Sequence, residues 1–376
     1  MRDVARARGS AGLVVASTFS GGGGSCLGYE MAGYRVAWAC ELNAEARATF
    51  AANHPGTVID ARSVREVKGA ELLAACGLKR GELDVLDGSP PCTVFSSAGD
   101  REDKWGMQVE HEGITQRVDD LFFEYTRLVS EVQPRAFVAE NVAGMVQGKA
   151  WGYFVDVSRA LRSAGYRVAT RMLDAQWLGV PQSRQRVIFV GVREDLELEP
   201  PFPSPLPYRY SILDALPYLE LGKEDHPDAP TPEELAEVQV GDHLQFILPR
   251  EPSTGEGRIY IRGGFPARAG RTFSLHEPAL TIMGQGMGGV AKDQVCVELP
   301  RRSLSEPLRL RFFTSREAAR LCSFPADFEL TGARAARWMR VGNAVPPRMM
   351  YAIARELRER VFRPAGRVSP ELVEAP

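Results

Sequence analysis

Short apolar runs alternate with amphipathic segments over the first half of the chain. The apolar runs are predicted to be strands, at residues 13–19, 34–40, 58–60, 83–86, 136–139, 166–173 and 187–192. The segments with helical spacing lie between them, at residues 25–32, 44–53, 121–132 and 154–164. Strands that alternate with helices in this way form a mainly parallel sheet with helices on both faces. The pattern therefore predicts a doubly wound α/β fold.

This alternation stops at Pro200, where a proline-rich run covers residues 200–207. Residues 208–300 are rich in glycine and proline and hold only short β-like pieces, which indicates a small, irregular second domain. Helical spacing returns at residues 315–322, 335–341 and 348–360. Arginines and glycines interleave between positions 255 and 271, which is a weak indication of nucleic-acid contact.

Composition excludes several classes of protein. The 376 residues carry a net charge of −2, so no basic field over the whole chain indicates a nucleic-acid partner. No apolar run approaches the roughly 18 residues that span a bilayer, and the N-terminus lacks a secretory pattern. The six cysteines include no C-x-x-C pair and have no histidine at ligand spacing. We therefore expect a protein of the reducing cytoplasm, with no disulfide framework, no metal site and no membrane.

A single cysteine stands at the end of a buried strand, in the run Gly88-Ser89-Pro90-Pro91-Cys92. Proline cannot donate to a sheet ladder, so Pro90 and Pro91 stop the strand and stiffen the backbone before Cys92. Open α/β sheets bind their ligands at the carboxyl ends of the strands. A rigid thiol there, followed by a polar loop through about Arg117, predicts a nucleophile with a lid. The alternative is a buried structural cysteine, a common environment for free cysteine.

The glycine-rich run Phe19-Ser20-Gly21-Gly22-Gly23-Gly24 joins the first predicted strand to the first helix. Glycines there allow close backbone approach and expose helix N-terminal amides to a ligand. Glu41 ends the second strand, where a carboxylate accepts hydrogen bonds from ribose hydroxyls. Asp60 ends the third strand, where it can accept from an adenine amino group. Together these residues predict a nucleoside site, and a purely structural tight turn is the alternative.

Two further strand ends carry polar side chains. Glu140 follows an apolar strand, where desolvation favours its protonated form, so it can give a proton to a substrate. Standing alone, Glu140 would equally well cap the following helix. Ahead of the last predicted strand, alternation puts Gln182, Arg184 and Arg186 on one side of an extended chain. Two guanidiniums on one face suit a carbonyl oxygen, a carboxylate or a phosphate, although such residues more often form surface salt bridges.

Six segments, taken together and in this order, resemble the DNA cytosine-5 methyltransferases, and the resemblance covers most of the chain. They are Phe19-Ser20-Gly21-Gly22-Gly23-Gly24, Gly88-Ser89-Pro90-Pro91-Cys92, Glu140-Asn141-Val142, Gln182-Ser183-Arg184-Gln185-Arg186, Arg316-Glu317-Ala318-Ala319-Arg320-Leu321 with Phe324-Pro325, and Gly342-Asn343-Ala344-Val345-Pro346-Pro347. The resemblance implies the class I S-adenosylmethionine-dependent methyltransferase fold. It implies a catalytic domain at residues 1–199 and 306–365, a target-recognition domain at 200–305 that reads bases in the major groove, and a tail at 366–376.

The resemblance also implies a reaction. Cys92 is expected to add to C6 of a cytosine flipped out of DNA, and Glu140 to protonate N3 of that base. Arg186 is expected to hold the O2 side, and Arg184 to steady the catalytic loop or a phosphate. C5 then receives a methyl group from S-adenosylmethionine, after which the C5 proton and the thiolate leave. No metal is needed.

Site residues follow from the same resemblance. Those expected to bind the cofactor are Phe19, Gly21, Gly23, Glu41, Leu42, Asp60, Pro91, Leu121, Asn343 and Val345. Those expected to contact DNA are Ser96, Asn141, Gln182, Arg258, Arg262, Arg268, Arg271 and Thr281. Ser17 departs from the family pattern, because many members have an aspartate there, and the change could weaken or rearrange a contact near the cofactor's amino group.

The implied protein is a sequence-specific enzyme of bacterial restriction-modification, or an orphan enzyme of the same kind. We expect it to act on double-stranded DNA as a monomer in the bacterial cytoplasm, at the nucleoid, with any cognate restriction endonuclease acting separately. A tRNA cytosine-5 methyltransferase is one alternative, although the Cys-Phe-Thr signature of that branch is absent here. An inactive nucleic-acid-binding homologue is the other, against which the intact Cys92, Glu140, Arg184 and Arg186 argue.

Overall fold

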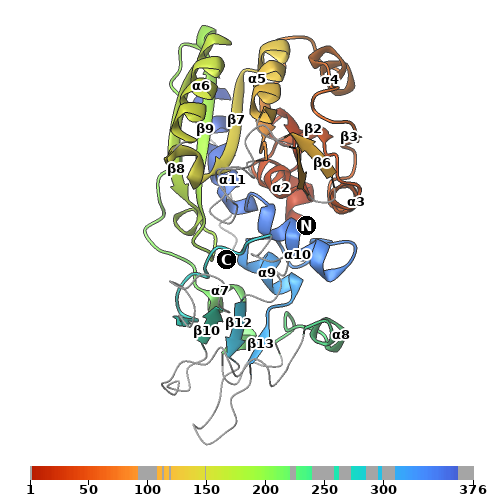
Figure 1. Cartoon of the computed structure of the whole chain (residues 1–376), viewed down its shortest axis with the longest axis vertical. Helices are drawn as coiled ribbons and strands as arrows, with labels where there is room; N and C mark the ends of the chain where they lie inside the picture. Colours follow the sequence, from red (N-terminus) through yellow and green to blue (C-terminus); the bar gives the residue numbers. More distant parts are fainter. Residues whose placement is uncertain are drawn as a thin grey trace, which may run out of the picture.

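A seven-stranded sheet runs through the larger part of the molecule (Figure 1). Its strands lie in the order β3 (Val58–Asp60), β2 (Arg35–Cys40), β1 (Val14–Thr18), β4 (Val85–Gly88), β7 (Ala136–Val142), β9 (Gln185–Arg193) and β8 (Tyr166–Asp174). Neighbours from β3 to β7 pair in parallel, whereas β9 pairs antiparallel with both β7 and β8. The predicted mainly parallel sheet is therefore confirmed, with β9 running opposite to the others.

The computed structural model describes residues 2–91, 108–111, 114–117, 120–148, 150–220, 226–238, 258–261, 272–284, 295–298 and 310–362. Helices cover both faces of the large sheet, as the alternation predicted. One apolar cluster packs α4 (Gly69–Cys76), α5 (Leu121–Val132) and α6 (Ala150–Ser163) against one face. The other packs α2 (Gly24–Met31), α3 (Ala44–Asn53) and α11 (Pro347–Leu357) against the opposite face. Neighbouring residues of β1 point to opposite faces, so Ala16 joins the first cluster and Val15 the second.

The end of the chain returns to the layer that contains its beginning. Met349 and Ile353 of α11 share an apolar cluster with Val15 of β1, and the Tyr34 hydroxyl donates to the Ala354 carbonyl oxygen at 3.0 Å. Two further helices, α9 (Ser315–Leu321) and α10 (Arg334–Asn343), precede α11. Helical spacing resumes after the irregular segment because these helices bury apolar residues against the first part of the chain.

A second, smaller sheet lies at one end of the molecule, and helices α4, α5 and α6 lie at the other end (Figure 1). Its antiparallel strands are β11 (Thr272–Ser274), β10 (Arg258–Ile261), β12 (Val295–Glu298) and β13 (Leu310–Phe312), in that order. Two short helices, α7 (Ile212–Ala215) and α8 (Pro232–Ala236), come before them in the chain. Because β13 pairs with β12, this sheet includes residues beyond position 305. The domain boundaries of the sequence analysis stay a prediction.

One described part of the region after Cys92 differs from the expected loop. β5 (Gln108–His111) and β6 (Ile114–Arg117) pair as an antiparallel hairpin, with Gln108 opposite Arg117. Residues 108–117 are mostly polar, so they lack the apolar alternation that would predict strands. Backbone pairing alone can join two such short strands across a tight connection.

Candidate active site at the carboxyl edge of the sheet

The glycine-rich segment joins the carboxyl end of β1 to the start of α2. Phe19 has a φ of 54°, a left-handed conformation that is costly for a residue with a side chain and is found mainly at functional sites. A Cβ atom at Gly23 would overlap the His54 ring, and one at Gly24 would lie 2.5 Å from the Val345 carbonyl oxygen. Only glycine permits both approaches. The loop is therefore held between the end of α3 and the C-terminal segment that contains Val345.

Glu41 lies directly after β2 and turns its carboxylate toward this loop. Its Oε2 accepts from the Gly21 backbone N–H at 2.8 Å, and its Oε1 accepts from the Asn43 N–H at 2.7 Å. The carbonyl oxygens of Glu41 and Leu42 both accept from the Arg47 guanidinium. Two backbone donors therefore orient the Glu41 carboxylate, a group that can accept hydrogen bonds from hydroxyls. The predicted ribose acceptor is thus placed beside the glycine-rich loop.

Asp60 ends β3, as predicted, but its carboxylate has partners from its own segment. Arg62 donates from Nη2 to Oδ2 at 2.7 Å and from Nε to Oδ1 at 3.1 Å, and its backbone N–H also donates to Oδ1 at 2.9 Å. The hydrogen bond from the Arg62 side chain holds the pKa of Asp60 below its ordinary value. Arg62, which the sequence analysis did not single out, therefore orients this carboxylate. Its contact with an adenine amino group stays a prediction.

The remaining cofactor candidates lie at different depths. Leu121 begins α5 and is buried in the apolar cluster on that face. Asn343 ends α10, and its Oδ1 approaches Gly284 so closely that no side chain fits there. The Val345 carbonyl approaches Gly24, as described above. Pro91 is the last described residue before the segment that contains Cys92. Of these candidates, Val345 is the one in direct contact with the glycine-rich loop.

Glu140 and Arg186 meet across neighbouring strands. The Arg186 Nε lies 2.7 Å from the Glu140 Oε1, and both side chains are largely buried, at 13% and 11% exposure. The contact forms because β7 continues to Val142 and β9 starts at Gln185, so the two strands remain paired through both residues. Both strands were predicted to be shorter at these ends. Glu140 is therefore part of an ion pair in the strand, rather than the isolated desolvated carboxyl group or helix cap that the sequence suggested.

The next residue links this pair to the cysteine segment. The Asn141 side-chain amide donates to the Pro90 carbonyl oxygen at 3.4 Å, and Asn141 is buried. Strands β4 and β7 are parallel neighbours in this part of the sheet. The end of β4, which leads into Cys92, is thus fixed beside Glu140.

Gln182 and Arg184, which were predicted to lie on one side with Arg186, are core residues in the structure. Gln182 and Arg184 are 0% and 1% exposed, and both contact other segments of the chain. The Gln182 amide approaches the Cys322 sulfur at 3.0 Å, while its Oε1 accepts from the Ile282 N–H at 3.2 Å. Both Gln182 and Arg184 precede β9, and Gln182 forms an isolated bridge with Ala279.

Arg184 donates to two backbone carbonyl oxygens from other segments of the chain. Its Nη1 donates to the Ile282 carbonyl at 3.1 Å, and its Nη2 donates to the Gly342 carbonyl at 2.8 Å. Burial lowers its pKa to about 9, which still leaves it charged at neutral pH. Arg184 joins the large sheet to the segment around Ile282 and to α10. Thr281 lies in the same contact, where its hydroxyl donates to the Ser183 carbonyl at 2.6 Å.

Asp87 is a buried acidic residue that the sequence analysis did not identify as a site residue. It lies in β4, is 2% exposed, and accepts hydrogen bonds from Ser17, Ser25 and Tyr29. Ser17, the departure from the family pattern, thus contacts a carboxylate on the neighbouring strand. An acidic residue inside an otherwise apolar strand was the available signal in the sequence.

Several predicted residues cannot be placed. Cys92, Ser96, Arg262, Arg268 and Arg271 lie outside the described residues, and Arg258 is described only as the first backbone position of β10. Among the described residues, no group of three or more His, Cys, Asp or Glu side chains could hold a metal ion. None of the described helices is both long and apolar enough to cross a membrane.

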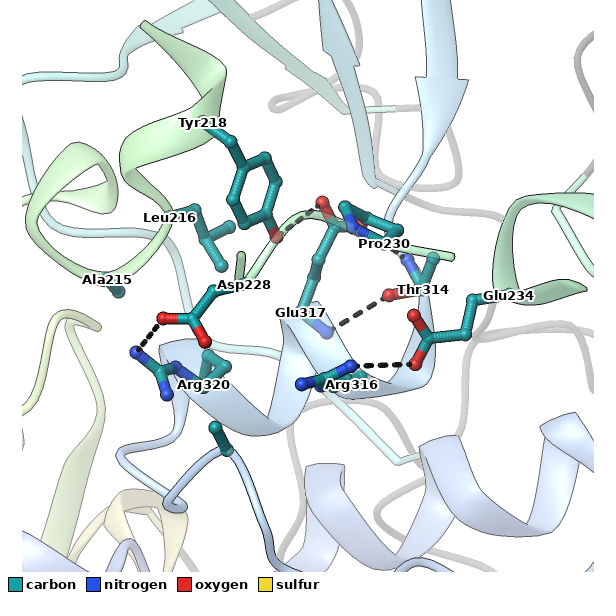
Figure 2. A pocket seen from close by; sticks show the side chains of 11 residues that line it. Ala215, Leu216, Tyr218, Asp228, Pro230, Glu234, Thr314, Arg316, Glu317 and Arg320 are labelled. Carbon is teal, nitrogen blue, oxygen red and sulfur yellow. Dashed lines mark hydrogen bonds and ion pairs between the residues drawn. The ribbon is translucent and has the colours of Figure 1, made fainter. Parts of the chain in front are cut away.

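A pocket beside α9 is lined largely by side chains that pair with one another (Figure 2). Arg320 lies 3.7 Å from Asp228, and Arg316 lies 3.6 Å from Glu234. Glu317 accepts from the Tyr218 hydroxyl at 3.0 Å, and it also forms a buried pair with Arg311. These contacts join the segment from Ala215 to Glu234 to α9. They explain the charged residues at positions 316, 317 and 320 as a structural contact.

The family model described as C-5 cytosine-specific DNA methylase matches residues 13–359. The chain belongs to this family. Type II methyltransferase M.NgoPII of Neisseria gonorrhoeae is 30% identical over 360 residues, which are 93% of this methylase and 97% of the relative. Type II methyltransferase M.FnuDI of Fusobacterium nucleatum is 30% identical over 357 residues, covering 91% and 93% of the two chains.

Solved structures share the fold of this methylase. A putative DNA modification methyltransferase encoded within a prophage of E. coli has a TM-score of 0.65 at 22% identity, and the match covers 93% of this methylase and all of that chain. The DNMT2 of Spodoptera frugiperda has a TM-score of 0.61 at 16% identity, with 93% and 100% covered. The predicted class I methyltransferase fold is confirmed, and the resemblance found in the sequence is confirmed by the family match.

Proposed function

We propose that this methylase transfers a methyl group from S-adenosylmethionine to C5 of cytosine at specific sites in double-stranded DNA, through a temporary bond between Cys92 and C6. One observation carries the proposal: the Glu140–Arg186 ion pair is tied, through Asn141 and Pro90, to the strand end that leads into Cys92. An acid, a cation and the end of the strand that precedes Cys92 in the chain thus meet at the carboxyl edge of the sheet, where α/β enzymes bind their substrates.

The described cysteines support the choice of Cys92 as nucleophile. Cys26, Cys40, Cys76 and Cys322 are buried, and burial raises the pKa of each thiol above its ordinary value, to about 11 for Cys76. A thiol must ionise before it can attack, so these four are poorly suited to nucleophilic catalysis. Cys92 follows the paired prolines in the sequence and is the cysteine that the family resemblance assigns as nucleophile.

The chain's own groups divide the chemistry as follows. The Cys92 thiolate adds to C6 of the base, which makes C5 nucleophilic, while Glu140 supplies a proton to N3 and Arg186 neutralises the O2 side. Once C5 is methylated it loses its proton, and the thiolate leaves C6, restoring the double bond. C6 is inaccessible in a stacked duplex, so the cytosine must be flipped out of the helix first.

The glycine-rich edge fits S-adenosylmethionine, which supplies a methyl group bound to a positively charged sulfur. Glu41, oriented by the Gly21 and Asn43 amides, is a carboxylate of the kind that accepts from ribose hydroxyls. The strained Phe19 and the close approach of Val345 to Gly24 form a fixed cradle at the carboxyl end of β1. We assign Phe19 to the adenine face, Asp60 to the adenine edge, and Gly21, Gly23, Leu121, Asn343 and Val345 to the rest of the pocket.

The relatives suggest a biological role. Both carry Type II methyltransferase names, so we propose that this methylase also serves a restriction-modification system, in which a cognate endonuclease acts as a separate protein. We place it as a monomer in the bacterial cytoplasm, bound to the nucleoid through DNA. DNA contacts from Arg258, Arg262, Arg268 and Arg271 are part of the same proposal.

Bisulfite sequencing of DNA from a host that expresses the protein tests the reaction and identifies the target together. We expect one short sequence to be protected at a single cytosine, with no protection in a host that expresses Cys92→Ala. A duplex with 5-fluorocytosine at that cytosine should trap the wild-type enzyme covalently, because fluorine blocks the elimination step. Failure to trap an enzyme that is active on ordinary DNA would exclude Cys92 as the nucleophile.

A further inference from the structure

Asp87 lies beneath the glycine-rich loop and contacts both of its flanks. Its Oδ2 accepts from the Ser17 hydroxyl at 2.9 Å and from the Ser25 hydroxyl at 2.8 Å, and its Oδ1 accepts from the Tyr29 hydroxyl at 3.3 Å. Ser17 belongs to β1, before the loop, and is the direct neighbour of Asp87 in the strand register. Ser25 and Tyr29 belong to α2, after the loop.

The backbone of Asp87 adds a fourth contact with the same segment. Its carbonyl oxygen accepts from the Thr18 hydroxyl at 3.1 Å, one residue before Phe19. The two ends of the loop are therefore held by one residue of β4. Since β4 leads into Pro90, Pro91 and Cys92, that residue also connects the cofactor cradle to the catalytic strand end.

The carboxylate has no cationic partner in the described part of the chain. The titratable side chains that interact electrostatically with Asp87 are neutral or acidic: Cys26, Tyr29, Tyr125 and Glu140. Hydroxyl donors stabilise a carboxylate less than an ion pair does, and a buried charge without a counter-charge is costly. Burial raises the pKa of Asp87 to about 6, so the group is mostly ionised at neutral pH despite this cost.

We propose that Asp87 is a positioning residue of the cofactor site, which fixes the glycine-rich loop and supplies a buried negative charge that favours the cationic groups of the cofactor, its sulfonium and its ammonium group. The proposal rests on the proposed function, in which this loop binds S-adenosylmethionine. Asp87 acts through the loop and through its electric field. Its role differs from that of Glu41, which faces the loop from β2 and is oriented by backbone amides.

Binding of S-adenosylmethionine, measured by calorimetry between about pH 5.5 and 7.5, tests the proposal. Wild-type affinity should rise with pH through about 6, because the ionised carboxylate favours a cationic ligand. At lower pH the carboxyl group is protonated and neutral, so it attracts the ligand less. Asp87→Asn should bind about tenfold more weakly at pH 7.5, the effect of one pKa unit of interaction, and its affinity should no longer follow pH. Asp84→Asn is the matched control, since Asp84 precedes the same strand but pairs with Arg135, away from the loop.

A relocated carboxylate gives a sharper test than its removal. Ser17 and Asp87 are register neighbours whose side chains touch, so Ser17→Asp combined with Asp87→Ser moves the charge across one strand. We expect this double variant to recover most of the affinity and the pH dependence that Asp87→Ser alone loses. Ser17→Asp alone places two carboxylates together and should shift the rise in affinity to higher pH.

The outcomes separate this proposal from the proposed function. Wild-type affinity and pH profile in a folded Asp87→Asn protein would overturn the role of Asp87 and leave the cofactor assignment intact. Absence of binding by the wild-type protein would overturn both. If Asp87→Asn does not fold, Ser25→Ala decides: it removes one donor from the carboxylate, so a midpoint moved to higher pH supports the proposal and an unchanged midpoint contradicts it.

Discussion

The Arg186 guanidinium lies 2.7 Å from the Glu140 carboxylate, on neighbouring strands that run in opposite directions. The pair is mostly buried, so each charge depends on the other for stabilisation. A proton donor to a base and a cation for the O2 side of that base therefore occupy one fixed place beside β4. A substitution at either residue therefore also changes the electrostatic environment of the other.

Glu140→Gln should slow methyl transfer at least about a hundredfold, because a positioned acid typically contributes that much and an amide cannot give up a proton in the same way. Binding of cofactor and DNA should change little, since glutamine has nearly the same shape. Single-turnover rates and equilibrium binding check the two parts. Glu124→Gln on α5, whose partner is Arg127, is the control, and equal rates for Glu140→Gln and this control would refute the acid role.

Cys92→Ala should abolish methylation while DNA binding stays within about threefold of wild type, because the thiol forms a bond to the base but is a small part of the interface. Filter binding and transfer of a labelled methyl group measure the two properties. Cys76→Ala removes a described buried thiol on α4 and should keep full turnover per folded molecule. Methylation by Cys92→Ala at the wild-type rate would leave the covalent mechanism without its nucleophile.

Arg184→Met should destabilise the protein by about 2–4 kcal/mol, because it leaves the buried carbonyls of Ile282 and Gly342 without their donors. Denaturant unfolding measures this loss, and Arg159→Met, at an exposed ion pair on α6, should cost less than about 1 kcal/mol. The salt dependence of DNA binding distinguishes this structural role from a phosphate contact. A slope reduced by about one for Arg184→Met would restore the phosphate role that the sequence suggested.

Periodic patterns made the sheet predictable, and local non-periodic contacts limited the prediction of the site. Alternating apolar runs placed all seven strands of the large sheet, because the central strands bury residues on both faces. The core contacts of Arg184 were not predicted, because their carbonyl partners lie 98 and 158 positions away in the chain.

The partners of Asp87 could not be predicted for a related reason. Ser17, Ser25 and Tyr29 lie between 58 and 70 positions away in the chain, and nothing in a single sequence links their hydroxyls to one carboxylate. Glu41 was easier to place, because a strand end about 20 residues after a glycine-rich loop is a recognised position for a ribose acceptor.

Asp87→Asn should gain stability relative to wild type as pH rises toward neutral, although it weakens cofactor binding. The pKa of Asp87 is raised from 3.8 to about 6, so the folded protein holds this proton more tightly than the unfolded chain does. The contribution of Asp87 to stability is therefore complete below about pH 4 and is lost as pH rises through about 6, a change of roughly 2–3 kcal/mol. Asparagine does not titrate, so the stability of Asp87→Asn relative to wild type should increase by that amount between pH 4 and 7.5.

Denaturant unfolding of both proteins across this range measures the difference, and a constant difference would show that Asp87 is not a destabilising buried charge. A stabilised protein that binds its cofactor less well is the signature of a charge that serves binding, because a purely structural residue would lose stability when replaced.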